Sequence, residues 1–429
     1  MMNKKSNYLK LSTIFFSLLL AVVFSLAIPN TSKAASLGKV TNIKQTYGSY
    51  NDEYNAYIVM LKYNKVAGAT GYFAEISTDK VNWEPAKEYS TSNIDTFAIG
   101  LYTKLKPAST YYVRITPYQG DNYYDSADTS APIQVVTAPA AVSGSIKQTG
   151  AKTNSVTASW NKVAGATGYK VYVKKSGDSE YIASGTTTST SYKLAKYNGK
   201  KLTADSIYYI GVCATKTSES GFVAESLPSS VTNFCTLPNK TKKIIAASWK
   251  PGTSSLKIMW TPASVASGYD VYFYNSKNKV VKKATSTTNA YTFTKAPKAG
   301  FCSVKVRPYI KTDNGKKIAS SWSKKTYFIS QSSIKNDFTL VNGKLTIKWT
   351  KVSGASNYAV YAGTSATNMK KVATVSSKKT SCTIKKISGS TVSKYGTYYV
   401  KVIPQKKVSG TTYKGDHGWY SRLRMIYYY

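Results

Sequence analysis

The residue types that most often carry catalysis are sparse in this chain of 429 residues. Its one histidine, His417, lies between Asp416 and Gly418 near the C-terminal end, and a lone loop histidine is more often a solvated side chain than a catalyst. Asp337 and Asp416 are the only acids after Asp313. There is no nucleophile elbow, phosphate-binding loop or metal-ligand spacing. We therefore expect no enzyme activity, no metal site and no cofactor.

Cysteine offers little more chemistry. Cys213, Cys235, Cys302 and Cys382 are too few and too scattered for a disulfide framework. Only Cys213 and Cys235 fall in the same repeat, as defined below. The strand register places them several residues apart, beyond the Cα separation that a bridge tolerates. We therefore favour two free thiols over a disulfide bridge between Cys213 and Cys235.

Charge is the remaining chemical signal, and lysine supplies most of it. Lys and Arg number 59 against 19 acids, a net charge of +40. Residues 35–139 carry −1 and 140–238 carry +6, whereas 239–330 carry +16 and 331–429 carry +15. Such a field attracts polyanions and speeds their association. A solvated face that keeps the protein soluble is the alternative, but it would not require the two halves to differ so much.

Eight lysine pairs concentrate the positive charge of the C-terminal half. Lys305 and Arg307 alternate outward on one predicted strand, near Tyr272 and Tyr274. Aromatic rings beside cations can stack on sugars or on each other. We expect Trp83 to be exposed and to be the best single contact residue. The candidates for aromatic contact are Trp83, Tyr272 and Tyr274, and those for polyanion contact are Lys282, Lys283, Lys305, Arg307, Lys316, Lys317, Lys324, Lys325, Lys370, Lys371, Lys378, Lys379, Lys406 and Lys407.

The elements that carry these residues are four copies of one unit. Residues 65–72 and 162–169 both read KVAGATGY, and related versions occur at 262–269 and 351–358. In every copy an aromatic residue precedes the final tyrosine by nine positions. The pairs are Tyr63 and Tyr72, Trp160 and Tyr169, Trp260 and Tyr269, and Trp349 and Tyr358.

The flanks of each copy alternate apolar and polar residues with period two, which indicates strands. The second copy is the clearest example. Its predicted inward set is Val156, Ala158, Trp160, Tyr169, Val171 and Val173, and its predicted outward set is Lys170, Tyr172 and Lys174. Each copy therefore begins with two strands joined by a glycine-containing loop.

A second landmark follows about forty residues later. An aliphatic residue precedes a tyrosine by six positions in three copies: Leu105 and Tyr111, Leu202 and Tyr208, and Val392 and Tyr398. Such a tyrosine, held by a corner hydrogen bond at the start of the sixth strand, is a known device of two-sheet sandwiches. The third copy has Ala296 and Cys302 instead, so we expect it to lack the corner bond.

Together the second-strand tryptophan, the third-strand tyrosine and the corner resemble fibronectin type III domains. The W-x-K-V-x-G-A-x-x-Y core resembles the version found in secreted proteins of Gram-positive bacteria. The resemblance implies an all-β chain of four seven-stranded sandwiches. With boundaries at Thr137-Ala138-Pro139, at Thr236-Leu237-Pro238 and near Ser330, they are repeat 1 (35–139), repeat 2 (140–238), repeat 3 (239–330) and repeat 4 (331–429).

The same family contains Trp-Ser elements in which basic side chains sandwich the tryptophan. Trp322 of repeat 3 and Trp419 of repeat 4 resemble these elements. Their expected partners in repeat 3 are Lys305 and Arg307, through cation–π contacts.

Residues 1–34 predict a signal peptide, with an apolar run from Leu11 to Ile28 and small residues before a cleavage point at Ala35. The alternative is an uncleaved anchor. No later apolar run approaches that length, so we expect no transmembrane segment after cleavage. The chain is predicted to be secreted, with retention on the cell wall as an option.

These observations favour a non-catalytic extracellular binding or spacer protein whose basic C-terminal half associates with anionic cell-wall polymers or other polyanions. An accessory carbohydrate-binding array for polysaccharide degradation and a host-matrix adhesin are the alternatives. Other surface proteins remain open as partners, and no specific nucleic acid partner is expected. Salt separates the first two functions, because polyanion binding weakens with ionic strength and neutral sugar binding does not.

Overall fold

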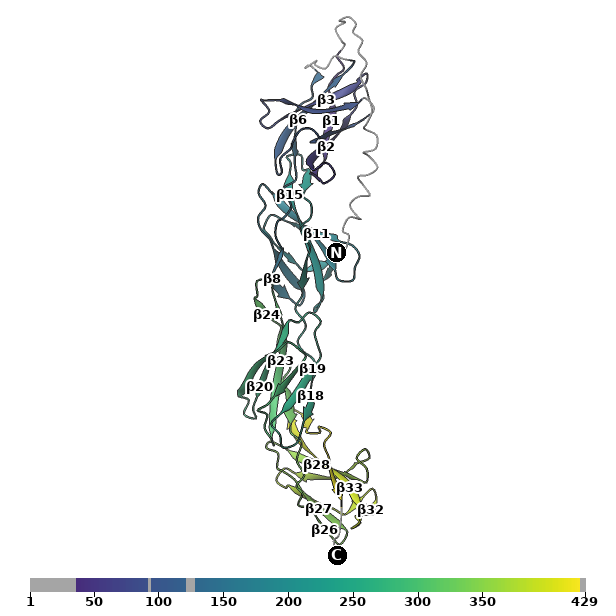
Figure 1. Cartoon of the computed structure of the whole chain (residues 1–429), viewed down its shortest axis with the longest axis vertical. Helices are drawn as coiled ribbons and strands as arrows, with labels where there is room; N and C mark the ends of the chain where they lie inside the picture. Colours follow the sequence, from purple (N-terminus) through teal and green to yellow (C-terminus); the bar gives the residue numbers. More distant parts are fainter. Residues whose placement is uncertain (1–35, 92–93, 121–127, 425–429) are drawn as a thin grey trace.

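The computed structural model describes residues 36–91, 94–120 and 128–424, so the predicted leader at 1–34 lies outside it. The described residues form antiparallel strands and no α-helix, which confirms the predicted all-β fold. Figure 1 shows four sandwiches arranged end to end in one elongated molecule. No helix that is long and apolar enough to cross a bilayer occurs in the described part of the chain.

Repeat 1 has the seven-stranded arrangement that the resemblance implied. A three-stranded sheet in the order β1-β2-β5 packs on a four-stranded sheet in the order β4-β3-β6-β7. The strands are β1 (Thr41–Asn51), β2 (Ala56–Asn64), β3 (Gly71–Ser77), β4 (Glu84–Thr91), β5 (Thr96–Ile99), β6 (Thr110–Tyr118) and β7 (Ile133–Val136).

Repeat 2 keeps this order, but its last strand is broken into two segments that pair with the same neighbour, β15. One sheet is β12-β9-β8, and the other is β11-β10-β15 with β16 and β17. The strands are β8 (Lys147–Lys152), β9 (Ser155–Ser159), β10 (Gly168–Lys175), β11 (Ile182–Thr187), β12 (Ser191–Leu194), β15 (Ile207–Thr217), β16 (Val223–Glu225) and β17 (Thr232–Cys235), with a short hairpin of β13 (Lys196–Tyr197) and β14 (Lys200–Lys201).

Repeats 3 and 4 follow repeat 2, including the broken last strand. Repeat 3 comprises β18 (Ile244–Trp249), β19 (Leu256–Trp260), β20 (Gly268–Tyr274), β21 (Val280–Ser286), β22 (Ala290–Phe293), β23 (Phe301–Lys311), β24 (Lys317–Ala319) and β25 (Thr326–Ile329). Repeat 4 comprises β26 (Thr339–Val341), β27 (Lys344–Lys348), β28 (Asn357–Gly363), β29 (Lys370–Ser376), β30 (Ser381–Ile384), β31 (Lys386–Ile387), β32 (Ser390–Thr391), β33 (Thr397–Val408), β34 (Thr411–Lys414) and β35 (Ser421–Arg424).

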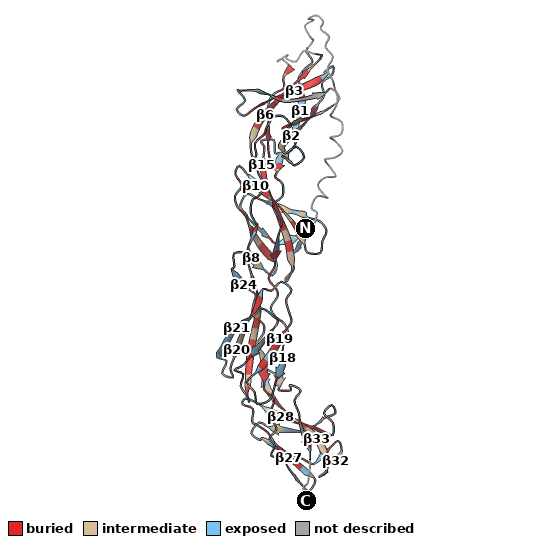
Figure 2. Cartoon of the chain, in the orientation of Figure 1, coloured by how far each residue is buried: buried red, intermediate tan, exposed pale blue. Residues whose placement is uncertain are grey.

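Each repeat has its own core between its two sheets, and Figure 2 shows the buried residues following the strands. In repeat 2 the six residues predicted to point inward are all buried, as the period-two pattern requires. The four nine-residue aromatic pairs meet edge to face in the cores, with ring centroids 4.8 to 5.4 Å apart. The constant spacing therefore reflects one packing contact repeated four times.

The final tyrosine of the repeated motif also has a polar role. Its hydroxyl accepts a hydrogen bond from the backbone N–H six residues earlier in all four repeats, at 2.8 to 3.0 Å. The donors are Val66, Val163, Ala263 and Val352. The tyrosine ring thus packs in the core while its hydroxyl holds the loop by a hydrogen bond, because a buried hydroxyl requires a partner.

The predicted corner bonds are present in three repeats. The N–H groups of Lys106, Thr203 and Ser393 donate to the hydroxyls of Tyr111, Tyr208 and Tyr398 at 2.9, 3.1 and 2.8 Å. Each donor directly follows the aliphatic residue of the sequence landmark. In repeat 3 that position is Pro297, which has no N–H to donate, and the buried Cys302 replaces the tyrosine.

Neighbouring repeats meet through the same two loops at all three junctions. The glycine loop of each later repeat contacts the corner loop of the repeat before it. A Cβ added to Gly165 would lie 2.5 Å from the Cβ of Ala108. Asp205 accepts hydrogen bonds from two backbone N–H groups in the loop of repeat 3, those of Ser264 and Val265, at 2.9 and 3.0 Å. At the last junction the N–H of Ser353 donates to the carbonyl of Ala299 at 3.1 Å.

Candidate polyanion-binding groove

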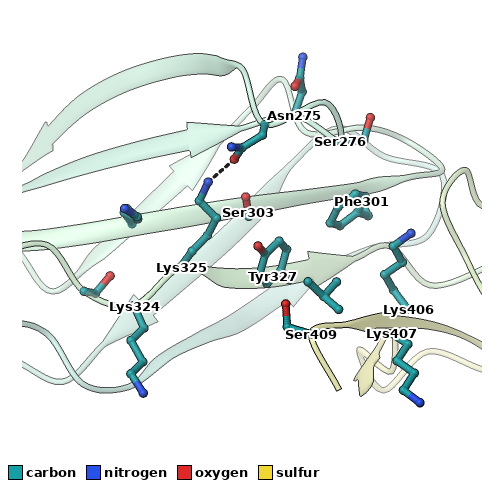
Figure 3. Close-up of a pocket in the computed structure, with 14 residues that line it drawn as sticks. Asn275, Ser276, Phe301, Ser303, Lys324, Lys325, Tyr327, Lys406, Lys407 and Ser409 are labelled. Atoms are coloured by element: carbon teal, nitrogen blue, oxygen red, sulfur yellow. Dashed lines mark hydrogen bonds between the residues drawn. The ribbon is translucent and has the colours of Figure 1, made fainter. Parts of the chain in front are cut away.

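An open groove of about 780 Å³ lies where repeat 3 meets repeat 4 (Figure 3). Repeat 3 contributes residues of β23, of β25 and its approach, and of the turn after β20. Repeat 4 contributes the end of β33 and the first residue of the turn that follows it. The lining residues are Asn275, Ser276, Asn278, Phe301, Ser303, Lys305, Ser323, Lys324, Lys325, Tyr327, Lys406, Lys407, Val408 and Ser409.

Aromatic contacts hold the two sides of this groove together. Phe301 and Tyr327 of repeat 3 stack with centroids 5.9 Å apart and planes 20° from parallel. Tyr327 also packs on Tyr413 of repeat 4 at 5.1 Å, and the ammonium of Lys406 lies 5.4 Å from the centre of the Phe301 ring. The spacing between lysines of the two repeats is therefore set by packed rings rather than by a free linker.

The groove concentrates positive charge without a compensating carboxylate. None of Lys305, Lys324, Lys325, Lys406 and Lys407 forms an ion pair with an acid in the described residues. Burial and the nearby charge of Lys305 lower the pKa of Lys325. Lys325 donates to the side-chain oxygen of Asn278. Its ammonium also lies 4.0 Å from the centre of the Tyr274 ring. The like charges of Lys305 and Lys325 act on each other, which favours an anion between them.

Two of the other predicted contact residues, Arg307 and Lys317, share one buried carboxylate. Asp270, which is buried, pairs with Arg307 at 2.9 Å and with Lys317. Arg307 also stacks on Trp322 at 4.4 Å, as predicted for the tryptophan ladder, whereas no contact between Lys305 and Trp322 is observed among the described residues. The remaining candidates are exposed and lie outside the groove lining: Lys282, Lys283, Lys316, Lys370, Lys371, Lys378 and Lys379.

The aromatic candidates lie against cations of the protein itself. Trp83 is half-buried, and Arg114 lies over its ring at 4.3 Å. The expectation that Trp83 is exposed is therefore wrong, because the guanidinium of Arg114 covers the ring. Tyr272 packs on Trp322 at 4.5 Å, and Tyr274 faces Lys325.

His417 is not the solvated loop residue that the sequence suggests. It is half-buried at the junction of repeats 3 and 4, and its Nε2 lies 2.9 Å from the carbonyl oxygen of Ile329. Its ring centre is 5.5 Å from that of Trp249 in repeat 3. Burial lowers the pKa of His417. The imidazole thus packs between two repeats.

Sequence reasoning missed the residues that join the groove, above all Phe301, Tyr327 and Tyr413. Tyr327 carried a usable signal, because it alternates with the buried Phe328 on β25 and so points away from the core.

The four cysteines are free thiols. Burial raises the pKa of Cys213 and of Cys302 to about 12, which leaves both as unreactive thiols.

No family model matches the chain, and no curated protein matches it. Among solved structures, the chain is similar to the crystal structure of chicken CNTN1 FN1-FN3 domains. That similarity covers 68% of this chain and 98% of the other, with 14% identity and a TM-score of 0.28. The assignment to tandem fibronectin type III-like sandwiches therefore rests on the strand order of each repeat.

Proposed function

We propose that this chain is a non-catalytic, secreted binding and spacer protein of the cell surface. Its two C-terminal repeats bind an anionic cell-wall polymer of a Gram-positive bacterium. The observation that supports the proposal best is the groove between repeats 3 and 4, where five lysines meet with no acid of the described residues paired to them. Repeats 1 and 2 then serve to extend the molecule.

The chemistry of the groove fits a chain of repeated negative charges. Its lysines come from both repeats, so one flexible polymer can contact several at once. Each ammonium is a compact charge on a flexible stem and makes no demand for a fixed bidentate geometry. Binding of this kind gains little from any single contact and depends on their number. It should weaken steeply as salt shortens the screening length to about 8 Å near 0.15 M.

A comparison of two full-length variants with equal charge tests this proposal. The groove variant carries Lys305→Gln, Lys325→Gln, Lys406→Gln and Lys407→Gln. The control carries Lys282→Gln, Lys283→Gln, Lys370→Gln and Lys371→Gln, which are exposed lysines outside the groove. The measurement is retention on purified wall bearing teichoic acid, and on heparin, at low and moderate salt.

We expect the groove variant to lose at least about tenfold in affinity at low salt, because four contacts of a few tenths of a kcal/mol or more each are removed together. The control should lose much less, and salt should elute the native protein. Equal losses of affinity in both variants would show that binding depends on general surface charge and not on the groove. Retention that ignores salt would instead support the carbohydrate-binding alternative.

A further inference from the structure

A second, smaller pocket lies at the same junction but shares no lining residue with the groove. Its volume is about 190 Å³. Lys250 comes from repeat 3 and Ser332 from the linking segment, while Lys401, Trp419 and Tyr420 come from repeat 4.

Trp419 differs from every other tryptophan of the chain. All seven tryptophans lie in the described residues, and the other six are buried or half-buried. The side chain of Trp419 is 43% exposed and that of the adjacent Tyr420 is 49% exposed. Its counterpart Trp322 is covered by Arg307 at 4.4 Å, whereas the nearest cation to Trp419 is Lys250 at 6.0 Å, the outer limit of such a contact. The ring of Trp419 in repeat 4 is therefore open to solvent, whereas Arg307 covers the corresponding ring of Trp322 in repeat 3.

The pocket also contains a buried hydroxyl that bonds to nothing in the described residues. Ser332 is 4% exposed, and its Oγ has no hydrogen-bond partner. Buried polar atoms are nearly always paired, so an orphan beside a pocket indicates a partner from outside the fold. Gln331, its neighbour, is fully engaged. Its side-chain oxygen accepts from the N–H groups of His417 and Trp419, at 3.0 and 3.2 Å, and its amide donates to the Trp419 carbonyl.

We propose that this pocket binds one pyranose ring of a neutral glycan. A pyranose has an apolar face of C–H groups, which suits the Trp419 ring, and a rim of hydroxyls, which suits the Ser332 Oγ. The charge of the lining is small, because Asp416 pairs with Lys401 at 2.9 Å and Lys250 is the one other charged residue that lines the pocket. This site goes beyond the proposed function, because its ligand is uncharged and its residues are not those of the groove.

The test uses the full chain at high salt, which suppresses binding in the groove. The probes are soluble tetrasaccharides of β-1,4-linked glucose, α-1,4-linked glucose and β-1,4-linked N-acetylglucosamine, titrated by calorimetry to about 10 mM, since a single sugar site binds in the millimolar range. The variants are Trp419→Ala and Ser332→Ala. Tyr395→Ala is the matched control, because Tyr395 is also on repeat 4, is 64% exposed and does not line the pocket.

We expect the native chain and Tyr395→Ala to bind at least one probe equally. Trp419→Ala should weaken that binding about tenfold or more, as expected for loss of a central aromatic contact. Ser332→Ala should weaken it about 2- to 12-fold, the range of one hydrogen bond. Ser332→Ala should not lower the melting temperature, because it removes a hydroxyl that the free protein leaves unpaired.

Folding failure is separable from loss of the site. Trp419 holds Gln331 through its backbone, so truncating the ring should leave the junction intact. Heparin binding at low salt reports whether the junction of repeats 3 and 4 is intact in the variant, since the groove needs the same junction. Three results would overturn the proposal: no probe binds, Trp419→Ala binds like the native chain, or Ser332→Ala keeps full affinity.

Discussion

Tyrosine hydroxyls act in this fold as acceptors for loop N–H groups. Four are on the third strand of their repeats and three are at corners. Each ties a loop to the core without another backbone strand, which helps to explain why tyrosine outnumbers phenylalanine, 37 to 12. Repeat 3 lacks both partners of the corner bond, because Pro297 has no N–H to donate and Cys302 has no hydroxyl to accept. That repeat is predicted to be the least stable.

The missing donor changes what a repair of repeat 3 should do. Cys302→Tyr alone should destabilise it by about 1–3 kcal/mol, because a large side chain enters a site that is 1% exposed and its hydroxyl finds no N–H at residue 297. Adding Pro297→Lys restores the donor and should recover part of that loss. Hydrogen exchange of the amides in β20 and β23, measured in the full chain, reports the stability of this repeat. A gain from Cys302→Tyr alone would contradict the proposed geometry.

At the scale of elements, the repeated glycine loop serves two purposes. Within a repeat it receives the tyrosine hydroxyl, and between repeats it contacts the preceding corner loop. At the junction of repeats 1 and 2 both demands favour a glycine, whereas repeat 3 has Val265 at the corresponding position. Gly165 has φ +69° and lies against Ala108, so a side chain there would be strained and would also collide with repeat 1.

Gly165→Ala should therefore loosen the junction of repeats 1 and 2. Gly68→Ala is the matched control, because Gly68 occupies the same loop position in repeat 1 with φ +81° and its nearest neighbour is only a Leu37 methyl at 3.4 Å. Both variants pay the backbone strain, about 1 kcal/mol. Only the first should increase bending in small-angle X-ray scattering and speed hydrogen exchange near Ala108. Equal behaviour of the two would show that the loop contact does not stiffen the junction.

At the scale of the whole molecule, the junction of repeats 3 and 4 combines positive charge with packed contacts between the repeats. The net charge of repeats 3 and 4 is +31, and the junction between them carries the groove, the smaller pocket and His417. Packed side chains from both repeats determine how far apart the two halves of the groove lie. A change in this junction should therefore change binding without altering any lysine.

His417 makes this junction sensitive to pH. Its pKa in the folded chain lies below the ordinary value of about 6.5, because burial disfavours the charged ring. Between the folded and unfolded values the unfolded state binds more protons, so stability rises with pH there. The contribution is fully present above about pH 6.5 and is lost as the pH falls through the lower folded pKa.

We expect scattering curves to show more bending between repeats 3 and 4 at pH 5 than at pH 8. His417→Gln should remove that difference, because the glutamine amide can still donate to the Ile329 carbonyl and does not titrate. The Lys401–Asp416 pair lies beside this site, so Asp416→Asn serves as the second control. A native chain that bends equally at both pH values would contradict the role of the imidazole.

The sequence by itself determined the unit and its number. The nine-residue aromatic spacing, the period-two strands and three corner tyrosines are relations within one repeat, which local packing repeats each time. It also showed that the positive charge lies in the C-terminal half of the chain, since composition requires no coordinates.

Only the tertiary structure decided which charges act together. Lys305 and Lys406 are about a hundred positions apart in the sequence and line one groove, beside the contact of Tyr327 with Tyr413. Asp270 neutralises Arg307 because the register of β20 and β23 makes them partners. His417 and Trp419 gain their environments from the repeat before them. Contacts between repeats depend on the relative placement of two folded surfaces, and alternation along a strand carries no information about that placement.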